Sequence, residues 1–378
     1  MRDSKRRSVR RRPPPTRPNP SSSPRTGEAR RLSLVVAMAV LALLPVGMIV
    51  GTAAAGDVPR THGPASPAGP TAAPSPASAL QWHQLTHLPT APSARDRFGM
   101  AYDPVLNETV LFGGYNPGSS AVIFGDTWAF RHGGWHQLAP SSSPAPRSGF
   151  VLTYDPARHG IVLFGGEDFS VHYGDTWLFN GTGWHQLSFA HNPLARSQYA
   201  MVYDGSAHAV VLFGGSDGTR DLSDTWELNS SGWHRILGAP HPAGRQFSEM
   251  AYDPSDHEAV LTGGLNATVG AEHGTWAFSG GHWTKLAVSP NPPSEVQSLA
   301  TTLPGGGALY FGGQSSGGTT LTNATWVFSH GSWTHTYYAS APGARKAGGL
   351  AYDSGGHFSL MFGGAATNVW LGDTWELY

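Results

Sequence analysis

Short apolar segments alternate with turn-forming residues along residues 81–378. In the first copy of this pattern, β-prone segments of four to six residues occur at Phe98–Asp103, Thr109–Phe112, Asp126–Phe130 and Trp135–Leu138. Turn formers such as Asp103-Pro104 and the glycines after His132 separate them. Segments this short, bounded by glycine and proline, predict strands. We therefore expect an all-β unit of four strands that recurs along the chain.

A glycine pair at the end of an apolar run marks each recurrence. The pairs are Gly113-Gly114, Gly165-Gly166, Gly214-Gly215, Gly263-Gly264, Gly312-Gly313 and Gly363-Gly364. Successive pairs are 52, 49, 49, 49 and 51 residues apart. Because glycine has no Cβ, we expect each pair to end the second strand of its unit, where close packing or a positive φ is needed.

Aromatic residues repeat in step with the glycines. A Thr-Trp pair supplies Trp128, Trp177, Trp226, Trp276, Trp326 and Trp375. A second tryptophan follows seven residues after the first five of these, at Trp135, Trp184, Trp233, Trp283 and Trp333. A Tyr-Asp pair supplies Tyr102, Tyr154, Tyr203, Tyr252 and Tyr352, and the fifth copy has Thr301-Thr302 instead. Since each indole can bury about 150–250 Å², we expect the tryptophans to fill the space between adjacent units.

A period near 50 residues with a glycine pair in every copy resembles the kelch-repeat family throughout residues 81–378. The resemblance implies a six-bladed β-propeller with four-stranded blades around a central channel. Galactose oxidase is a kelch protein of similar architecture, but its copper-radical chemistry relies on a tyrosine cross-linked to cysteine. This chain has no cysteine, which excludes that chemistry, disulfides and thiolate nucleophiles.

The two ends of the repeat region complement each other. The sixth copy stops at Trp375–Tyr378, before its outer strand. The missing strand stands at the other end, because Trp82–Leu85 has the same sequence as Trp135–Leu138 and Trp184–Leu187. We predict that this N-terminal strand completes the last blade, so that only short, protected edges remain. Residues 81–378 then form one domain, which we expect to be monomeric.

The first 80 residues have a different composition. Residues 1–31 carry eleven basic and two acidic side chains with nothing apolar to bury, which predicts a disordered basic cytoplasmic tail. Residues 32–56 contain no charge and include about 19 mostly apolar positions, enough for a transmembrane anchor. Arg30 and Arg31 precede them, so the propeller would lie outside the cytoplasm. Residues 57–80, rich in proline, alanine and serine, predict an extended spacer.

An alternative for residues 32–56 is a cleaved signal peptide, with Ala53 and Ala55 as the small residues of a cleavage site. The propeller would then be secreted. The basic tail directly precedes this membrane segment, so attraction to anionic lipid explains it better than nucleic acid binding does.

Arginine and aspartate also recur. We align arginines at the start of the first strand in five copies, at Arg97, Arg147, Arg196, Arg245 and Arg345, with Glu295 in the fifth copy. An aspartate precedes Thr-Trp in four copies, at Asp126, Asp175, Asp224 and Asp373. The arginines could form a ring at one channel mouth that binds an anionic sugar or a peptide carboxylate. Alternatively, the arginines and aspartates pair within or between blades and lock them together, which we favour because both patterns are weakest around the fourth and fifth copies, where Gly274 and Ala324 replace the aspartate.

Other candidate sites are weaker. The spacing of Asp217, Asp221 and Asp224 could hold calcium, but no known loop motif is present and a solvated loop is the better interpretation. The histidines that follow the second tryptophans should face solvent, and we expect neither a metal nor a cofactor. Five sequons offer glycosylation sites at Asn107, Asn180, Asn229, Asn266 and Asn323.

These features favour a non-catalytic binding, adhesion or scaffold module for glycans or proteins, held at the membrane through residues 32–56. The connections after the glycine pairs differ most between copies, and variable loops on a constant frame suit recognition. They span residues 115–125, 167–174, 216–223, 265–273, 314–323 and 365–372. The alternative is a sugar-modifying enzyme resembling the sialic-acid mutarotases, with an unpaired arginine and a carboxylate converging in the channel.

Overall fold

The computed structural model describes residues 80–290, 292, 295–303, 305–315, 320–336, 338 and 340–378. The predictions of a basic tail, a membrane segment and a spacer over residues 1–79 lie outside this part of the chain. Among the described residues, no helix is long and apolar enough to cross a membrane.

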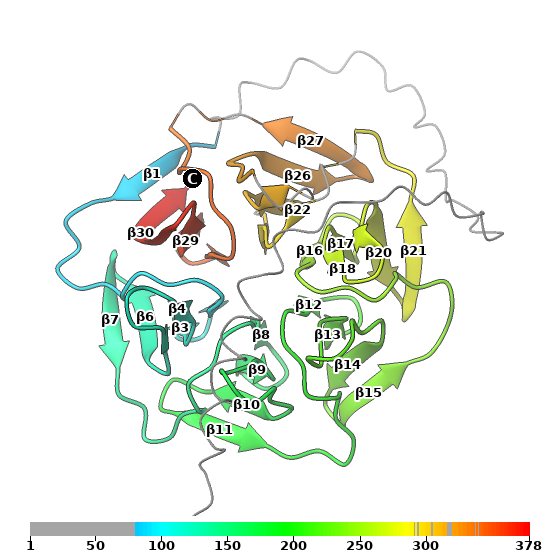
Figure 1. The fold of residues 1–378 in the computed structure, drawn as a ribbon, viewed down its shortest axis with the longest axis horizontal. Coiled ribbons are helices and arrows are strands. Elements are labelled where there is room, and N and C mark those ends of the chain that lie inside the picture. Colours follow the sequence, from blue (N-terminus) through cyan, green and yellow to red (C-terminus); the bar gives the residue numbers. More distant parts are fainter. Residues whose placement is uncertain are drawn as a thin grey trace, which may run out of the picture. The chain divides into compact units, whose positions relative to one another are not determined.

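Six four-stranded antiparallel sheets surround one axis, as Figure 1 shows. Blade 1 consists of β2 (Gly99–Asp103), β3 (Glu108–Phe112), β6 (Thr127–Arg131) and β7 (Gly134–Leu138). Blade 2 consists of β8 (Leu152–Asp155), β9 (Gly160–Phe164), β10 (Thr176–Phe179) and β11 (Trp184–Leu187). Blade 3 consists of β12 (Ala200–Asp204), β13 (Ala209–Phe213), β14 (Thr225–Asn229) and β15 (Gly232–Ile236).

Blade 4 consists of β16 (Glu249–Asp253), β17 (Glu258–Thr262), β20 (Thr275–Ser279) and β21 (His282–Leu286). Blade 5 consists of β23 (Leu299–Thr302), β24 (Ala308–Phe311), β26 (Thr325–Ser329) and β27 (Ser332–Thr336). Blade 6 consists of β28 (Gly349–Asp353), β29 (Phe358–Ala366), β30 (Val369–Leu377) and β1 (Trp82–Leu85). In each blade the first strand named is the inner strand and the last is the outer strand. The prediction of an all-β, six-bladed propeller is confirmed.

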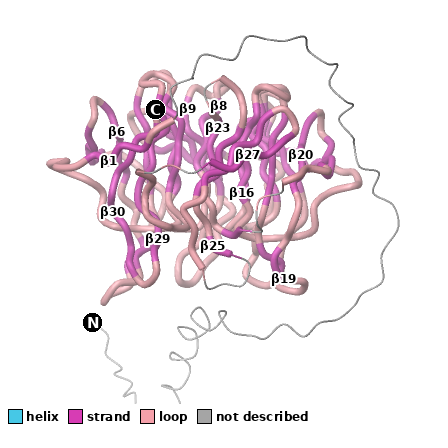
Figure 2. Tube along the Cα trace, turned by 90° about the horizontal axis from the view of Figure 1, so that it is seen from above, coloured by secondary structure: helices cyan, strands magenta, loops and turns pink. Residues whose placement is uncertain are grey.

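The connections between second and third strands leave the blades at one end, here called the loop face. Two of them contain a small hairpin: β4 (Tyr115–Asn116) with β5 (Val122–Ile123), and β18 (Leu265–Asn266) with β19 (Gly270–Ala271). In blade 5, β25 (Gln314–Ser315) of this connection pairs with β22 (Glu295–Val296), which lies in the linker before β23. In Figure 2, β19 and β25 lie together at the lower edge. The tight turns after the inner strands lie at the opposite end, here called the turn face.

The predicted closure of the ring is confirmed. β1 pairs antiparallel with β30, with Trp82 opposite Leu377 and Leu85 opposite Thr374. Figure 1 shows β1, in blue, beside the red strands of blade 6. The Trp82 side chain is buried and packs against Phe311 of blade 5, with ring centroids 5.3 Å apart.

The outer-strand tryptophans fill the seams between blades, as predicted. Each of Trp135, Trp184, Trp233, Trp283 and Trp333 donates its indole Nε1 proton to a threonine hydroxyl of the preceding blade, at 2.8–3.1 Å. Among the described residues, the indole of Trp82 has no such partner, although Thr325 of blade 5 occupies the equivalent position and its hydroxyl is also without a hydrogen bond there. The closing seam therefore has the apolar contact of the others without the hydrogen bond.

Strand register corrects one detail of the repeat alignment. Thr302 pairs with Ala308 as Tyr102 pairs with Thr109. The fifth copy therefore places Thr302-Leu303 where the other copies have Tyr-Asp, and not Thr301-Thr302 as the sequence alone suggested. Leu303 is buried and joins the apolar cluster around Trp82.

Candidate functional site

The glycine pairs shape the loop face. Both glycines of all six pairs have positive φ, as expected for residues that end the second strand. A Cβ on Gly114 would lie 2.9 Å from the carbonyl oxygen of Asp96. Because this oxygen belongs to the backbone, it cannot easily move away, and a larger residue would clash with it. The amide of Gly114 donates to the carbonyl of Arg147, in the linker that enters the next blade, at 2.9 Å. The pairs thus bring each second strand against its neighbouring blade.

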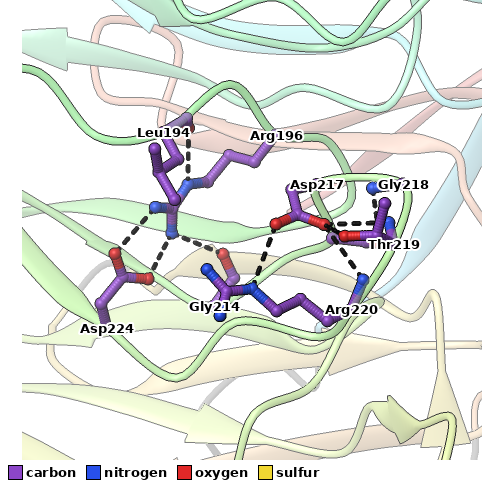
Figure 3. Close-up of polar contacts among 9 residues, drawn as sticks. Leu194, Arg196, Gly214, Asp217, Gly218, Thr219, Arg220 and Asp224 are labelled. Carbon is purple, nitrogen blue, oxygen red and sulfur yellow. Dashed lines mark hydrogen bonds and ion pairs between the residues drawn. The ribbon is translucent and has the colours of Figure 1, made fainter.

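In five of the six blades, a buried arginine in the linker before the inner strand joins parts of the blade through hydrogen bonds, an arrangement here called a staple. Arg196 is fully buried, and its Nη1 and Nη2 donate to the two carboxylate oxygens of Asp224 at 2.7 and 2.8 Å (Figure 3). Its other donors reach the carbonyls of Gly214 and Leu194. Asp224 also accepts the Nε1 proton of Trp226 at 2.7 Å. Linker, second strand and third strand are therefore joined through one guanidinium.

The electrostatics of this staple are those of a tight ion pair. Burial alone would raise the pKa of Asp224, but the hydrogen bonds and charge of Arg196 outweigh it and hold the pKa below its usual value. The same arrangement recurs in three other blades. The arginine–aspartate pairs are Arg95–Asp126, Arg147–Asp175 and Arg345–Asp373, with closest N–O distances of 2.6–2.7 Å.

This geometry corrects the predicted ring of channel-mouth arginines. Arg147, Arg196, Arg245 and Arg345 are at most 2% exposed and engaged within their blades, so their guanidiniums do not line a channel mouth. The fifth equivalent residue is Arg95, and the alignment of Arg97 with this set was wrong. A constant separation of 18 residues between arginine and glycine pair identifies Arg95, because Arg97 would give 16.

Blades 4 and 5 depart from the pattern. Gly274 replaces the aspartate in blade 4, and Arg245 pairs with Glu272 at 3.1 Å. Ala324 replaces it in blade 5, where the Nε1 of Trp326 has no hydrogen-bond partner. The staple is thus weakest in blades 4 and 5, as the sequence predicted.

The residues equivalent to Arg97 form a closed ring around the axis. They are Arg97, Gly149, Gln198, Phe247, Gln297 and Ala347, and all six have positive φ. The amide of each donates to the carbonyl of its equivalent in the preceding blade, at 2.7–3.1 Å, so six backbone hydrogen bonds complete the circle. Left-handed backbone costs about 1–2 kcal/mol per non-glycine residue, and the closed set of hydrogen bonds offsets that cost.

A central cavity of about 450 Å³ extends along the axis between the inner strands. The ring of backbone hydrogen bonds encircles its end at the loop face. Five half-buried tyrosines and Thr302 line the end at the turn face, at Tyr102, Tyr154, Tyr203, Tyr252 and Tyr352. Burial raises the pKa of each of these tyrosines. Their hydroxyls therefore remain neutral at physiological pH.

Arg97 is the one predicted arginine that reaches the central opening. Its side chain is 27% exposed, with Nε 3.4 Å from Asp96 and its guanidinium 4.9 Å from the ring centroid of Tyr115. Lys346, which sequence reasoning missed, lies nearby and donates to Gln314. Burial, together with the positive charge of Arg97, lowers the pKa of Lys346. The loop face therefore presents two cationic groups beside the axis.

Exposed apolar side chains stand next to these cations. Phe169 and Val171 of blade 2 are 50% and 49% exposed. The ring of Phe169 meets Tyr115 edge-on, with centroids 5.9 Å apart. On the other side, Trp370 of blade 6 donates its Nε1 proton to Asp96 at 3.1 Å. The loop tips thus combine aromatic, cationic and hydrogen-bonding groups around one opening.

The three aspartates considered for calcium have separate partners. Asp224 binds Arg196, Asp217 accepts from the side chain of Arg220 and from loop amides, and Asp221 accepts the amide proton of Ala267 (Figure 3 shows the first two). Within the described part of the chain, no group of three or more histidine, aspartate or glutamate residues is arranged to hold a metal.

The sequons differ in accessibility. Asn107, Asn180 and Asn323 are exposed, whereas Asn229 and Asn266 are half-buried. The amide nitrogen of Asn266 donates to the carbonyl of Gly244. The histidines after the outer-strand tryptophans are exposed, as predicted: His83, His136, His185 and His234.

Fold and site together define a closed propeller whose repeats are held by glycine turns, seam tryptophans and buried arginine staples. The family model of the KLHDC2/KLHL20/DRC7 kelch-repeats domain matches residues 76–264, half of the chain. The chain belongs to the kelch-repeat family, whose propellers are typically protein-interaction scaffolds. No curated protein matches the chain.

Proposed function

We propose that this kelch propeller is a non-catalytic binding module that recognises a protein or glycan through its loop face, outside the cytoplasm. The observation that carries the proposal is the grouping of Arg97 and Lys346 with the exposed ring of Phe169 around one opening. Cations beside aromatic rings suit a ligand with a carboxylate or other anionic group and an apolar or sugar face.

The location outside the cytoplasm rests on the sequence of residues 30–56, where two arginines precede an uncharged apolar stretch. The membrane is accordingly a proposed partner through residues 32–56. If the stretch is a cleaved signal, the same module is secreted.

The enzymatic alternative requires an unpaired arginine and a carboxylate in the channel. Glu249 lines the cavity, but the guanidinium of Arg97 lies over Tyr115 at the loop-face opening. Blade 4, which carries Glu249, also stands across the axis from blade 1. This separation favours binding over sugar chemistry.

The test is a screen of the protein against glycan and peptide arrays, followed by variants of the loop face. Arg97→Ala and Phe169→Ala should each weaken binding of an array ligand at least tenfold, as expected for central interface residues. Arg131→Ala is the matched control, because this arginine lies on the turn face with a 42% exposed side chain. An equal loss of ligand binding in Arg131→Ala, or no loss in the two loop-face variants, would show that the ligand binds elsewhere.

A further inference from the structure

Glu249 is the only carboxylic acid among the described residues that line the central cavity. It begins β16, and strand register assigns it the position held in the other blades by uncharged residues: Gly99, Val151, Ala200, Leu299 and Gly349. Only blade 4 therefore has an ionisable residue at this position of the inner strand.

Blade 5, which packs against Glu249, has smaller side chains at the facing positions than blade 2 has at the equivalent positions. At the seam of blades 1 and 2, a Cβ on Gly99 would lie 2.5 Å from Leu152 and 2.7 Å from Phe150, so nothing larger than glycine fits. At the seam of blades 4 and 5, the residues equivalent to Phe150 and Leu152 are Ser298 and Ala300. Smaller partners open the space that the glutamate side chain enters.

The aromatic packing of this seam is rearranged as well. Thr262 of blade 4 stands where five other blades have a phenylalanine on the second strand. Trp333 consequently packs on Tyr310 of its own blade, with centroids 5.1 Å apart. The Tyr310 hydroxyl is occupied by the backbone of Val260 and Ala251 and is not directed to the carboxyl.

No described residue pairs with the Glu249 carboxyl through a hydrogen bond or ion pair. Burial, unopposed by any partner, raises its pKa well above the usual value. The residue is half-buried and lines the cavity, so its carboxyl faces the cavity without a partner from the described protein, at a cost in solvation. Such groups are found where a ligand supplies the partner.

The turn-face mouth of the same cavity supplies a second element. Tyr252 stands three positions after Glu249 along β16, which is about 10 Å of strand. Tyr252 packs against the turn of the preceding blade at Gly205, and Tyr102 makes the corresponding contact with Gly355. Neutral tyrosine rings attract cations to their faces. A carboxyl about 10 Å below a tyrosine-lined mouth matches a short chain that ends in a positive charge.

We propose that the central cavity is a binding site for a small primary alkylammonium ion, with Glu249 as its counter-ion and the tyrosine ring as its entrance. Burial in the empty cavity favours the protonated form of the carboxyl. On binding, the carboxylic acid proton passes to solvent and the carboxylate pairs with the intact ammonium group, so one proton is released for each cation bound. This site is separate from the loop face and does not depend on the proposed function.

Isothermal titration of the full-length chain with n-pentylammonium tests the site, with 1-pentanol as a neutral ligand of similar shape. In buffers of different ionisation enthalpy near pH 4.5, where the raised pKa of Glu249 keeps the free carboxyl protonated, we expect release of close to one proton per cation and none with pentanol. Affinity should rise about tenfold per pH unit until Glu249 is ionised in the free protein. No binding of n-pentylammonium at millimolar concentration, or equal binding of pentanol, would overturn the proposal.

Glu249→Gln should remove both the binding of n-pentylammonium and the proton release. The matched control is Glu227→Gln, because burial also raises the pKa of Glu227 on β14 but this residue does not line the cavity. It should leave both unchanged. Unaltered binding in Glu249→Gln would refute the assignment. If that variant does not fold, proton release by the unmodified protein decides between the outcomes.

Discussion

Deletion of the closing strand should open the ring, whereas deletion of the residues before it should not. Removing residues 1–79 leaves every described contact of β1 in place, including that of the Leu80 side chain, which packs against the Trp82 cluster. Removing residues 1–90 takes away β1 and its pairing with β30. It also removes Leu85 and Leu88, which pack at the seam of blades 6 and 1.

The expected loss follows from the buried side chain. Trp82 is 3% exposed, and truncation of such a residue to alanine costs about 3–5 kcal/mol. A whole domain is stable by only about 5–15 kcal/mol. Trp82→Ala should therefore lower the urea midpoint markedly, and deletion of residues 1–90 should leave a chain that aggregates through the exposed edge of β30. His83→Ala, on the exposed side of the same strand, is the control and should change the free energy of unfolding by under about 0.5 kcal/mol.

A comparison of two tryptophans sharpens the test. Trp184→Phe removes a hydrogen bond to Thr127, whereas Trp82→Phe removes an indole N–H that has no partner. We expect Trp184→Phe to cost about 1 kcal/mol more, the net value of one hydrogen bond. Equal urea midpoints for the chains lacking residues 1–79 and 1–90 would refute closure by β1. A larger cost for Trp82→Phe than for Trp184→Phe would contradict the seam geometry.

Four further predictions concern other parts of the molecule. Asp224→Ala should cost about 3–5 kcal/mol in urea unfolding, because it leaves the fully buried Arg196 charge unpaired; a loss under about 1 kcal/mol would contradict the staple. Because the pKa of Glu249 is raised, the folded state binds the extra proton and stability should fall as pH rises above about 4.3, the unfolded value, until the folded pKa is reached. Glu249→Gln should flatten that part of the pH profile, and an unchanged profile would exclude an unpaired carboxyl. Replacing the tip at residues 217–220 with Gly-Ser residues should leave the melting temperature nearly unchanged, since the tip is mostly exposed, and a drop of several degrees would show hidden packing. Protease added to intact cells should cleave the propeller or spacer, and full protection until lysis would argue against a location outside the cytoplasm.

The replaceable tip of the blade 3 loop, residues 217–220, is shorter than the variable connection that the sequence indicated at residues 216–223. Replacing all of residues 216–223 would remove Leu222, which is 6% exposed and whose backbone bonds to Gly215 and Arg245. Variability between copies identified this connection as a loop, but it did not indicate which of its side chains turns back into the blade.

The sequence by itself determined the blades and their closure. Strand segments, turn glycines and the likeness of Trp82–Leu85 to Trp135–Leu138 are properties of short stretches, and six copies make each property visible against the others. Because side-chain alternation and turn chemistry act over a few residues, their repetition fixes strand number, order and the buried position of the seam tryptophans.

Only the tertiary structure decided which polar groups meet. Arg95 and Arg97 are two residues apart, yet one is buried against Asp126 and the other stands at the central opening. Glu249 gave no signal in the sequence, because its environment depends on Ser298 and Ala300, about 50 residues away in the next blade. Burial, ion pairing and pKa depend on how neighbouring blades pack, and that packing brings together residues whose separation along the chain far exceeds the range of any local pattern.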